Sequence, residues 1–145
     1  GDDLIDAGEG LDNIQAGSGN DTIVLSIDTD NDIINGGSGN DTLNGGALTS
    51  DLVVNLQSAT FNRTTVANGV VTLTGATAES DEIGADTLNA VENVTGGAGD
   101  DTIVGNASVN VLVGGAGADY LDGSTGNDTL TGGAGADEII GGLGN

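Results

Sequence analysis

Short runs of alternating apolar and polar residues recur along the chain with a spacing of nine residues. Each run centres on one large aliphatic residue, as in 42–44 (TLN) and 120–122 (YLD). Side chains of a strand alternate between its two faces, so the pattern predicts short strands whose central side chain points inward. The predicted inward residues are Ile5, Ile14, Ile23, Ile34, Leu43, Ile103, Leu112, Leu121, Leu130 and Ile139.

The residues that connect these strands follow one template, G-G-x-G-x-D-x-U-x, in which U is the large aliphatic residue. Full matches occupy 36–44, 96–104, 114–122 and 132–140, near matches occupy 7–15, 16–24 and 123–131, and 25–35 is two residues too long. The unit at 105–113 departs from the template, because Asn110 stands where the others have Asp. Tandem units of this kind predict a solenoid, in which each unit packs against its neighbours.

Glycine and aspartate determine the expected chemistry of each turn. Glycines at the first, second and fourth places allow backbone angles that other residues resist, and they let carbonyl oxygens approach one another. The Asp at the sixth place adds a carboxylate. Calcium takes six to eight oxygen ligands from carboxylates and carbonyls, so the turns favour calcium binding.

Two units for each coil of the solenoid place turns on the same side every 18 residues. The expected columns are Asp3, Asp21 and Asp41 opposite Asp12 and Asp32 in the first part of the chain, and Asp101, Asp119 and Asp137 opposite Asn110 and Asp128 in the last part. An ion shared by two successive carboxylates would turn their repulsion into attraction.

These tandem GGxGxD units resemble those of the repeats-in-toxin (RTX), or haemolysin-type calcium-binding, proteins. The resemblance covers 1–44 (the first block) and 96–145 (the second block). It implies an all-β fold, a right-handed parallel β-roll. It also implies a protein secreted unfolded by type I secretion from Gram-negative bacteria, which folds in extracellular calcium.

The resemblance assigns the binding of several calcium ions to the sixth-place carboxylates and to the carbonyls of the turns. The residues implied are Asp3, Gly8, Gly10, Asp12, Gly17, Gly19, Asp21, Asp32, Gly37, Gly39, Asp41, Gly97, Gly99, Asp101, Gly115, Gly117, Asp119, Gly126, Asp128, Gly133, Gly135 and Asp137. Asn110 departs from this pattern.

Composition narrows the possible partners and activities. The chain of 145 residues has 23 acidic residues and one basic residue, Arg63, and its net charge is −22. Such a charge argues against nucleic acid and against an anionic membrane surface. Without His or Cys, the usual catalytic triads, zinc sites and thiol nucleophiles are excluded, so we expect no enzymatic activity.

The same composition predicts a fold that depends on calcium. The chain has 28 glycines, which lose entropy on ordering, and only one Phe and one Tyr to enlarge a core. We therefore expect folding to be coupled to calcium binding, outside the cell or at its surface. The chain opens and stops within a repeat, which indicates an internal fragment, and it shows no signal peptide or transmembrane run.

Residues 45–95 interrupt the repeats but are expected to form strands. Alternating segments at 51–57, 64–74 and 86–94 predict them, the middle one as two strands around a turn at Asn68-Gly69. Wider coils that continue the stack are favoured over a projecting hairpin. The reason is that Leu88, Val91 and Val94 have the spacing of inward residues.

Two questions stay open in the sequence. The acidic residues Glu79, Asp81, Glu82 and Asp86 form either a solvated loop or an additional calcium site at the junction with the second block. The protein itself is either a calcium-binding structural module or a self-assembling, adhesive surface protein. Stacked rungs with open ends favour end-to-end association, which light scattering with added calcium would detect.

Overall fold

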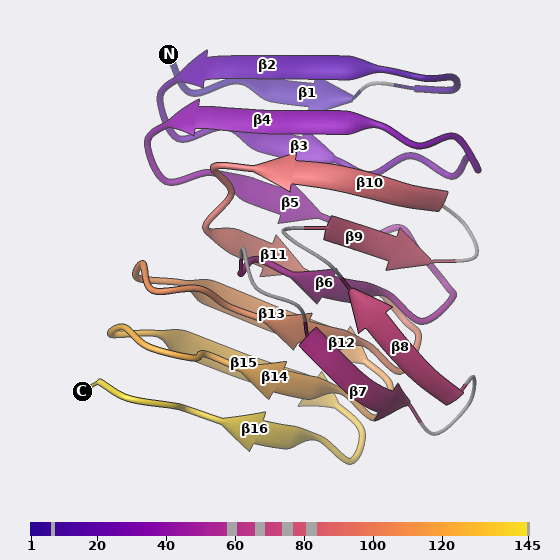
Figure 1. Ribbon diagram of the computed structural model, residues 1–145, viewed down its shortest axis with the longest axis vertical. Helices are drawn as coiled ribbons and strands as arrows, with labels where there is room; N and C mark the ends of the chain where they lie inside the picture. The colour runs from indigo at the N-terminus through magenta and orange to yellow at the C-terminus, as the bar shows by residue number, and fades with distance from the viewer. Residues whose placement is uncertain (7, 58–60, 66–68, 74–76, 81–83, 145) are drawn as a thin grey trace.

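The computed structural model describes the chain except residues 7, 58–60, 66–68, 74–76, 81–83 and 145. Within the described residues every regular element is a strand, and the strands stack as a parallel β-solenoid of about six turns (Figure 1). No helix of this part of the chain is long and apolar enough to cross a membrane. The prediction of an all-β parallel roll is confirmed.

The strands form two large sheets and one small sheet (Figure 1). The first sheet contains, in order, β1 (Leu4–Asp6), β3 (Thr22–Val24), β5 (Thr42–Asn44), β11 (Asn93–Thr95), β13 (Val111–Ala116) and β15 (Thr129–Ala134). The second sheet contains β16 (Glu138–Ile140), β14 (Tyr120–Asp122), β12 (Thr102–Val104), β6 (Val53–Asn55), β9 (Thr77–Ser80), β10 (Gly84–Asn89), β4 (Ile33–Ser38) and β2 (Asn13–Ser18). The third sheet pairs β7 (Phe61–Thr65) with β8 (Gly69–Leu73).

Strands of the repeat blocks pair in parallel with equivalent template places in register. Ile23 is the partner of Leu43 in the first sheet, and Leu121 is the partner of Ile139 in the second. Parallel pairing in register stacks the inward aliphatic residues of successive coils. The core is therefore a continuous row of side chains between the two sheets.

Burial confirms most of the predicted inward residues. Ile23, Leu43 and Ile103 are 0% exposed, and Leu130 packs against the core while partly buried. Ile139 is the exception, because it is 48% exposed in β16, the last strand of the second sheet. Among the residues that the structure describes, no strand of the first sheet lies beyond β15 to cover its inward face.

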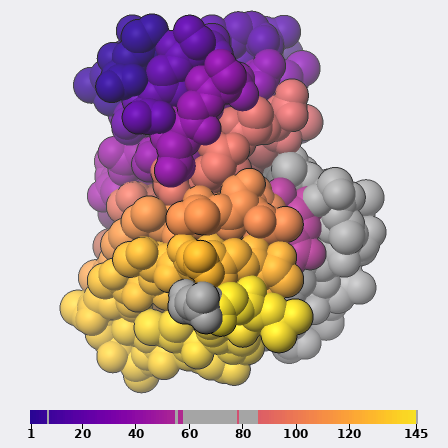
Figure 2. Space-filling view, turned by 90° about the vertical axis from the view of Figure 1, so that its left-hand side faces the viewer, coloured from indigo at the N-terminus to yellow at the C-terminus, as the bar shows by residue number. Residues whose placement is uncertain are grey.

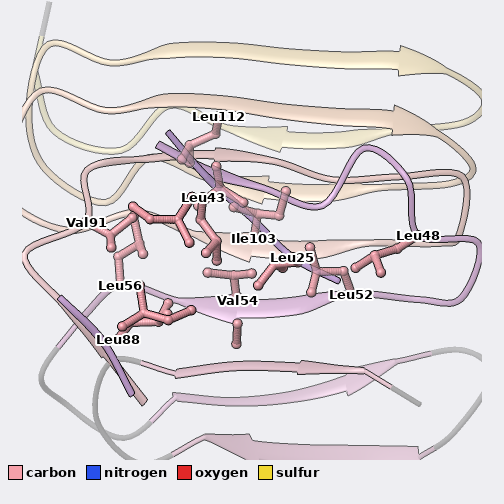
Figure 3. Close-up of a cluster of buried hydrophobic side chains, with 14 of the residues drawn as sticks. Leu25, Leu43, Leu48, Leu52, Val54, Leu56, Leu88, Val91, Ile103 and Leu112 are labelled. Carbon is pink, nitrogen blue, oxygen red and sulfur yellow. The ribbon is translucent and has the colours of Figure 1, made fainter. Parts of the chain in front are cut away.

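The interruption also contributes to the core. Its buried apolar residues are Leu48, Leu52, Val53, Val54, Leu56, Ala78, Leu88, Val91 and Val94, and Leu25 joins them from the stretched unit of the first block. Figure 3 shows several of these side chains in one cluster with Leu43, Ile103 and Leu112 of the repeats. The inward placement of Leu88, Val91 and Val94 is thus confirmed.

The interruption joins the two blocks by crossed strand pairings. In the first sheet β5 pairs directly with β11. In the second sheet β6, which follows the first block in sequence, pairs with β12 of the second block, whereas β10, which precedes the second block, pairs with β4 of the first. The antiparallel strand β9 lies between β6 and β10. Figure 2 shows the result, a single column with the residues near 90 between the two blocks.

Two details of the predicted interruption are wrong. The segment 86–94 is not one strand, because a corner separates β10 from β11, and Ala90 adopts a positive φ of 49° there. In the hairpin, Gly69 pairs with Thr65 as the first residue of β8, so it does not lie in the turn. Asn68 lies outside the described residues.

Of the two expected arrangements for the interruption, each applies to a different part. Strands β6, β9 and β10 continue the second sheet, as expected for wider coils. Strands β7 and β8 form an antiparallel hairpin with a sheet of its own.

Candidate metal centre

The sixth-place aspartates lie in two columns, one along each side of the solenoid. On the first side, the backbone N–H of Asp3 donates to Oδ1 of Asp21, and the N–H of Asp21 donates to Oδ1 of Asp41, both at 2.8 Å. On the second side, the N–H of Asp101 donates to Oδ1 of Asp119 at 2.8 Å. Each carboxylate is thereby fixed against the turn of the preceding coil.

Hydrogen bonds of the same kind, from a backbone N–H to a side-chain Oδ1, connect further members of both columns. They join Asp12 to Asp32, Asp119 to Asp137, and Asn110 to Asp128, with the later residue supplying Oδ1 in each pair. The sides on which the sequence placed these residues are therefore those of the structure. Asp32 keeps its place although its unit has two extra residues.

The second oxygen of these carboxylates distinguishes a cation site from a purely structural turn. Oδ2 is buried without a hydrogen-bond partner in Asp12, Asp21, Asp41, Asp119 and Asp128. A buried carboxylate oxygen without a partner destabilises a fold by roughly 1–3 kcal/mol or more. A bound cation would supply the missing interaction, so the residues present fit calcium.

Backbone carbonyls converge on the same places. A Cβ added to Gly123 would stand 2.7 Å from Oδ2 of Asp128 and 2.9 Å from the carbonyl oxygen of Gly141 in the next coil. A carboxylate oxygen and a carbonyl oxygen thus both lie close to the position that a Cβ would occupy on Gly123, the first glycine of its unit. In this turn only glycine leaves that point open, whereas the units at 7–15 and 16–24 have Ala at the first place.

The second and fourth glycines shape the loops that carry these carbonyls. Most of the predicted ones adopt positive φ, namely Gly8, Gly10, Gly17, Gly19, Gly37, Gly39, Gly115, Gly117, Gly126, Gly133 and Gly135. Gly97 and Gly99 do not. Their turn packs against the interruption, where Ala98 N–H donates to the carbonyl of Leu48 at 3.0 Å. The loop geometry of the template is therefore altered at the start of the second block.

Burial changes the acidity of several column carboxylates. Desolvation raises the pKa of Asp101 to about 6, although backbone N–H groups of Leu52 and Gly97 oppose the shift. Desolvation also raises the pKa of Asp119 and Asp32. Burial therefore makes ionisation of these carboxylates costly, and a neighbouring cation would offset that cost.

Two residues of the interruption belong to the columns and were not assigned to them from the sequence. Asp86 is 1% exposed, and its Oδ1 accepts the N–H of Asp32 at 2.9 Å. Glu92 occupies a sixth place on the other side, where its Oε2 accepts the N–H of Asp41 at 2.9 Å. Both follow from the register of β10 on β4 and of β11 on β5, which the repeat template does not contain.

Asp86 is therefore not part of a solvated loop, and that interpretation is wrong for this residue. Desolvation, with Asp32 and Asp28 nearby, raises its pKa to about 7. Of the other members of the expected acidic cluster, Glu79 lies in β9, and Asp81 and Glu82 lie outside the described residues.

Carboxylates alone do not form the candidate sites. Among the residues that the structure describes, no group of three or more acidic side chains converges in a metal-binding arrangement. Each ion would therefore be held by few carboxylates and several turn carbonyls, an oxygen-only set that suits calcium.

A family profile of the RTX calcium-binding nonapeptide repeat matches the chain in 4 copies, at residues 1–30, 28–47, 86–121 and 113–145. The copies together cover more than half of the chain. The chain belongs to this family. RTX nonapeptide repeats bind calcium, with several ions in each repeat domain. A search of curated proteins gave no match.

The RTX match explains one boundary of the interruption. Its third copy begins at residue 86, before the first full template match at Gly96. This start coincides with Asp86 of β10, which occupies a column position in the structure. The repeat architecture thus extends into the interruption beyond the strict sequence template.

Proposed function

We propose that this RTX chain is a calcium-binding structural module of a secreted bacterial protein, which folds when it meets calcium outside the cell. The observation that carries the proposal is the pair of carboxylate columns with buried, unpartnered Oδ2 atoms. Without cations, a net charge of −22 repels itself within a narrow stack. Low calcium inside the cell would keep the chain extended for export, and extracellular calcium would complete the fold.

The proposed ligands are the sixth-place aspartates and the carbonyls of the turn glycines. Asp119 represents the regular case, because it is 2% exposed, its Oδ1 accepts the N–H of Asp101, and its Oδ2 has no partner. Calcium bound there would supply positive charge to an oxygen that the protein leaves unpaired. The chain's own contribution is to fix the carboxylate and to exclude water from one side of it.

The proposal excludes two classes of partner and an enzymatic role for this chain. The acidic surface argues against nucleic acid and against membrane insertion. RTX β-rolls are generally structural and not catalytic. End-to-end self-association stays a prediction, which light scattering at increasing calcium would test.

A calcium titration of chelator-treated protein tests the proposal. We expect far-UV circular dichroism to change cooperatively from disordered to β, and magnesium to substitute poorly because it prefers a small octahedral shell. A spectrum that is equally β-rich in chelator and in calcium would overturn the coupling of folding to calcium.

A pair of substitutions makes the titration specific. Asp119→Asn should lower the number of bound calcium ions measured by equilibrium dialysis, because it removes a buried carboxylate. Asp122→Asn is the matched control, since Oδ1 of Asp122 accepts the N–H of Ser124 at 2.8 Å and an amide oxygen keeps this bond. Equal calcium binding by both variants would contradict the assigned ligands.

A further inference from the structure

The turn that precedes β11 is much shorter than the repeat turn on which it stacks. Asn35 is in register with Asn89 before the turn, and Thr42 is in register with Asn93 after it. The corner 90–92 therefore spans the same side of the solenoid as the six residues 36–41. It contains no glycine loop that could present several carbonyls to an ion.

In a regular coil, two hydrogen bonds connect each sixth-place turn to the next. The N–H of Asp101 donates to the carboxylate of Asp119, and the N–H of Tyr120 donates back to the carbonyl of Asp101, both at 2.8 Å. The earlier residue thus offers its N–H to the carboxylate of the later aspartate. Its carbonyl accepts the backbone N–H of the residue that follows this aspartate.

Both regular bonds are replaced between Glu92 and the next coil. The N–H of Glu92 turns back to the carbonyl of Asp41 at 3.1 Å, so no donor is left for a carboxylate at position 110. The N–H of Val111 donates to Oδ1 of Asn93 at 2.9 Å, so the carbonyl of Glu92 has lost its usual partner. The residue at position 110 therefore faces an acceptor and needs a donor.

Asn110 supplies that donor. The side chain is 0% exposed, and Nδ2 donates to the carbonyl of Glu92 at 2.6 Å and to Oδ1 of Asn106 at 3.3 Å. Its Oδ1 accepts the N–H of Asn106 at 2.9 Å. Unlike Oδ2 of Asp128 in the following turn, each polar atom of this amide has a partner.

Two further asparagines complete the arrangement. Nδ2 of Asn106 donates to the carbonyl of Val91 at 3.4 Å, and Nδ2 of Asn93 donates to Oδ1 of Asn40 at 2.5 Å. The side chains of Asn93, Asn106 and Asn110, here called the asparagine clasp, thus tie the corner 90–92 and the start of β11 to both neighbouring coils. The clasp adds no charge to the stack.

We propose that the asparagine clasp replaces calcium at the junction of the two blocks. The turn 105–110 binds no ion, and the column on this side consists of two calcium-binding parts joined by a coil that holds no ion of its own. As free calcium falls, β11 and β13 should lose their structure after the repeat coils further from the junction. The inference rests on the proposed function, because it presumes that the other turns bind calcium.

Hydrogen exchange at decreasing free calcium tests the clasp. We expect backbone amides of β11 and β13 to remain protected at calcium concentrations at which those of β3 and β16 exchange freely. Loss of protection in all these strands at one calcium concentration would overturn the clasp while leaving the proposed function intact. Protection that does not depend on calcium in any strand would instead overturn the proposed function.

Substitution of Asn110 provides the second arm. Asn110→Asp keeps the size of the side chain but places a carboxylate against the carbonyl of Glu92, and Asn110→Ala removes the hydrogen bonds without adding charge. Both variants should lower the protection of β11 and β13 about tenfold or more at intermediate calcium. Asn44→Asp is the matched control, because Oδ1 of Asn44 only accepts the N–H of Gly46 at 3.0 Å. Equal protection in Asn110→Ala, Asn44→Asp and the unmodified chain would refute the proposed role.

Discussion

Replacing Asp101 by Asn should weaken the response of the protein to calcium more than it weakens the fold itself. Asp101 is 1% exposed, and both of its oxygens accept backbone N–H groups, Oδ1 from Leu52 at 2.8 Å and Oδ2 from Gly97 at 2.9 Å. An amide can accept only one of these bonds. The substitution therefore removes one charge-assisted hydrogen bond, which costs roughly 1.5–3 kcal/mol.

A second effect of the same substitution opposes the first. Burial raises the pKa of Asp101 from 3.8 to about 6 even though both hydrogen bonds lower it, so ionisation of the carboxylate destabilises the fold at pH 7. Asparagine removes this cost. The two effects have opposite signs, so at a low calcium concentration that just permits folding we expect the free energy of unfolding to change less than at saturating calcium.

In calcium the balance differs, because the cation offsets the cost of the buried charge and the variant has lost a ligand. A site that is filled at a calcium concentration 100 times its Kd stabilises a fold by about 2.7 kcal/mol. We therefore expect the stabilisation by calcium to be smaller in Asp101→Asn by about 2–3 kcal/mol, measured by urea unfolding at low and at saturating calcium. An undiminished calcium increment would refute the assignment of Asp101 as a ligand.

Three further predictions concern acidity, packing and turn shape. Because burial raises the pKa of Asp86 to about 7, its contribution to the stability of the calcium-free fold is present below pH 4 and lost as the pH rises through 7; far-UV circular dichroism in calcium-free buffer that shows more β structure at pH 8 than at pH 5 would contradict this. Leu112→Ala, at a residue that is 0% exposed, should cost about 2–5 kcal/mol in urea unfolding, whereas Leu143→Ala, at 76% exposure, should change stability by less than about 0.5 kcal/mol. Gly114→Ala should weaken calcium binding in a calorimetric titration, because its Cβ would overlap a column carboxylate, whereas Gly141→Ala meets no atom within 4 Å and should bind normally; equal affinities would argue against the role of the first glycine.

The repeat blocks were predictable from sequence because each unit specifies its own place in the stack. Identical units that pair in register put Ile23 on Leu43 and Asp101 on Asp119 without any information from distant residues. The inward residues, the two columns and the all-β class follow from the period alone. The exposure of Ile139 was not predictable in this way. Its burial depends on a strand of the first sheet beyond β15, and the described residues form none there.

The junction was not predictable in the same way. Asp86 and Glu92 take their places because β10 pairs with β4 and β11 with β5, and these pairings connect residues separated by 54 and 51 positions. Residues 86–89 (DTLN) repeat the template tail at 41–44, but the glycine turn before them is missing, and the alternation through 86–94 predicts one strand where the backbone turns at Ala90. The departure at Asn110 was visible in the sequence, but its cause, the reversed N–H of Glu92, is a property of the three-dimensional corner.

The crossed pairings of the second sheet have a consequence for the order in which the molecule is assembled. A regular coil closes contacts between residues 18 positions apart, such as Asp101 and Asp119. The crossed pairings must instead bring together residues 49 and 54 positions apart, namely Leu52 with Asp101 and Asp32 with Asp86. Closing a segment of about three times the length costs roughly 1 kcal/mol more in chain entropy and slows the search for the contact.

Neither half can complete its second sheet by itself. The edge of β4 is covered only after residues 84–89 arrive, and the edge of β12 is covered only after residues 53–55 are in place. A chain that becomes available for folding from one end therefore carries an uncovered strand edge until the whole interruption is available. The last step of folding therefore depends on the interruption. Neither repeat block can complete its part of the second sheet before residues 53–55 and 84–89 are available for pairing.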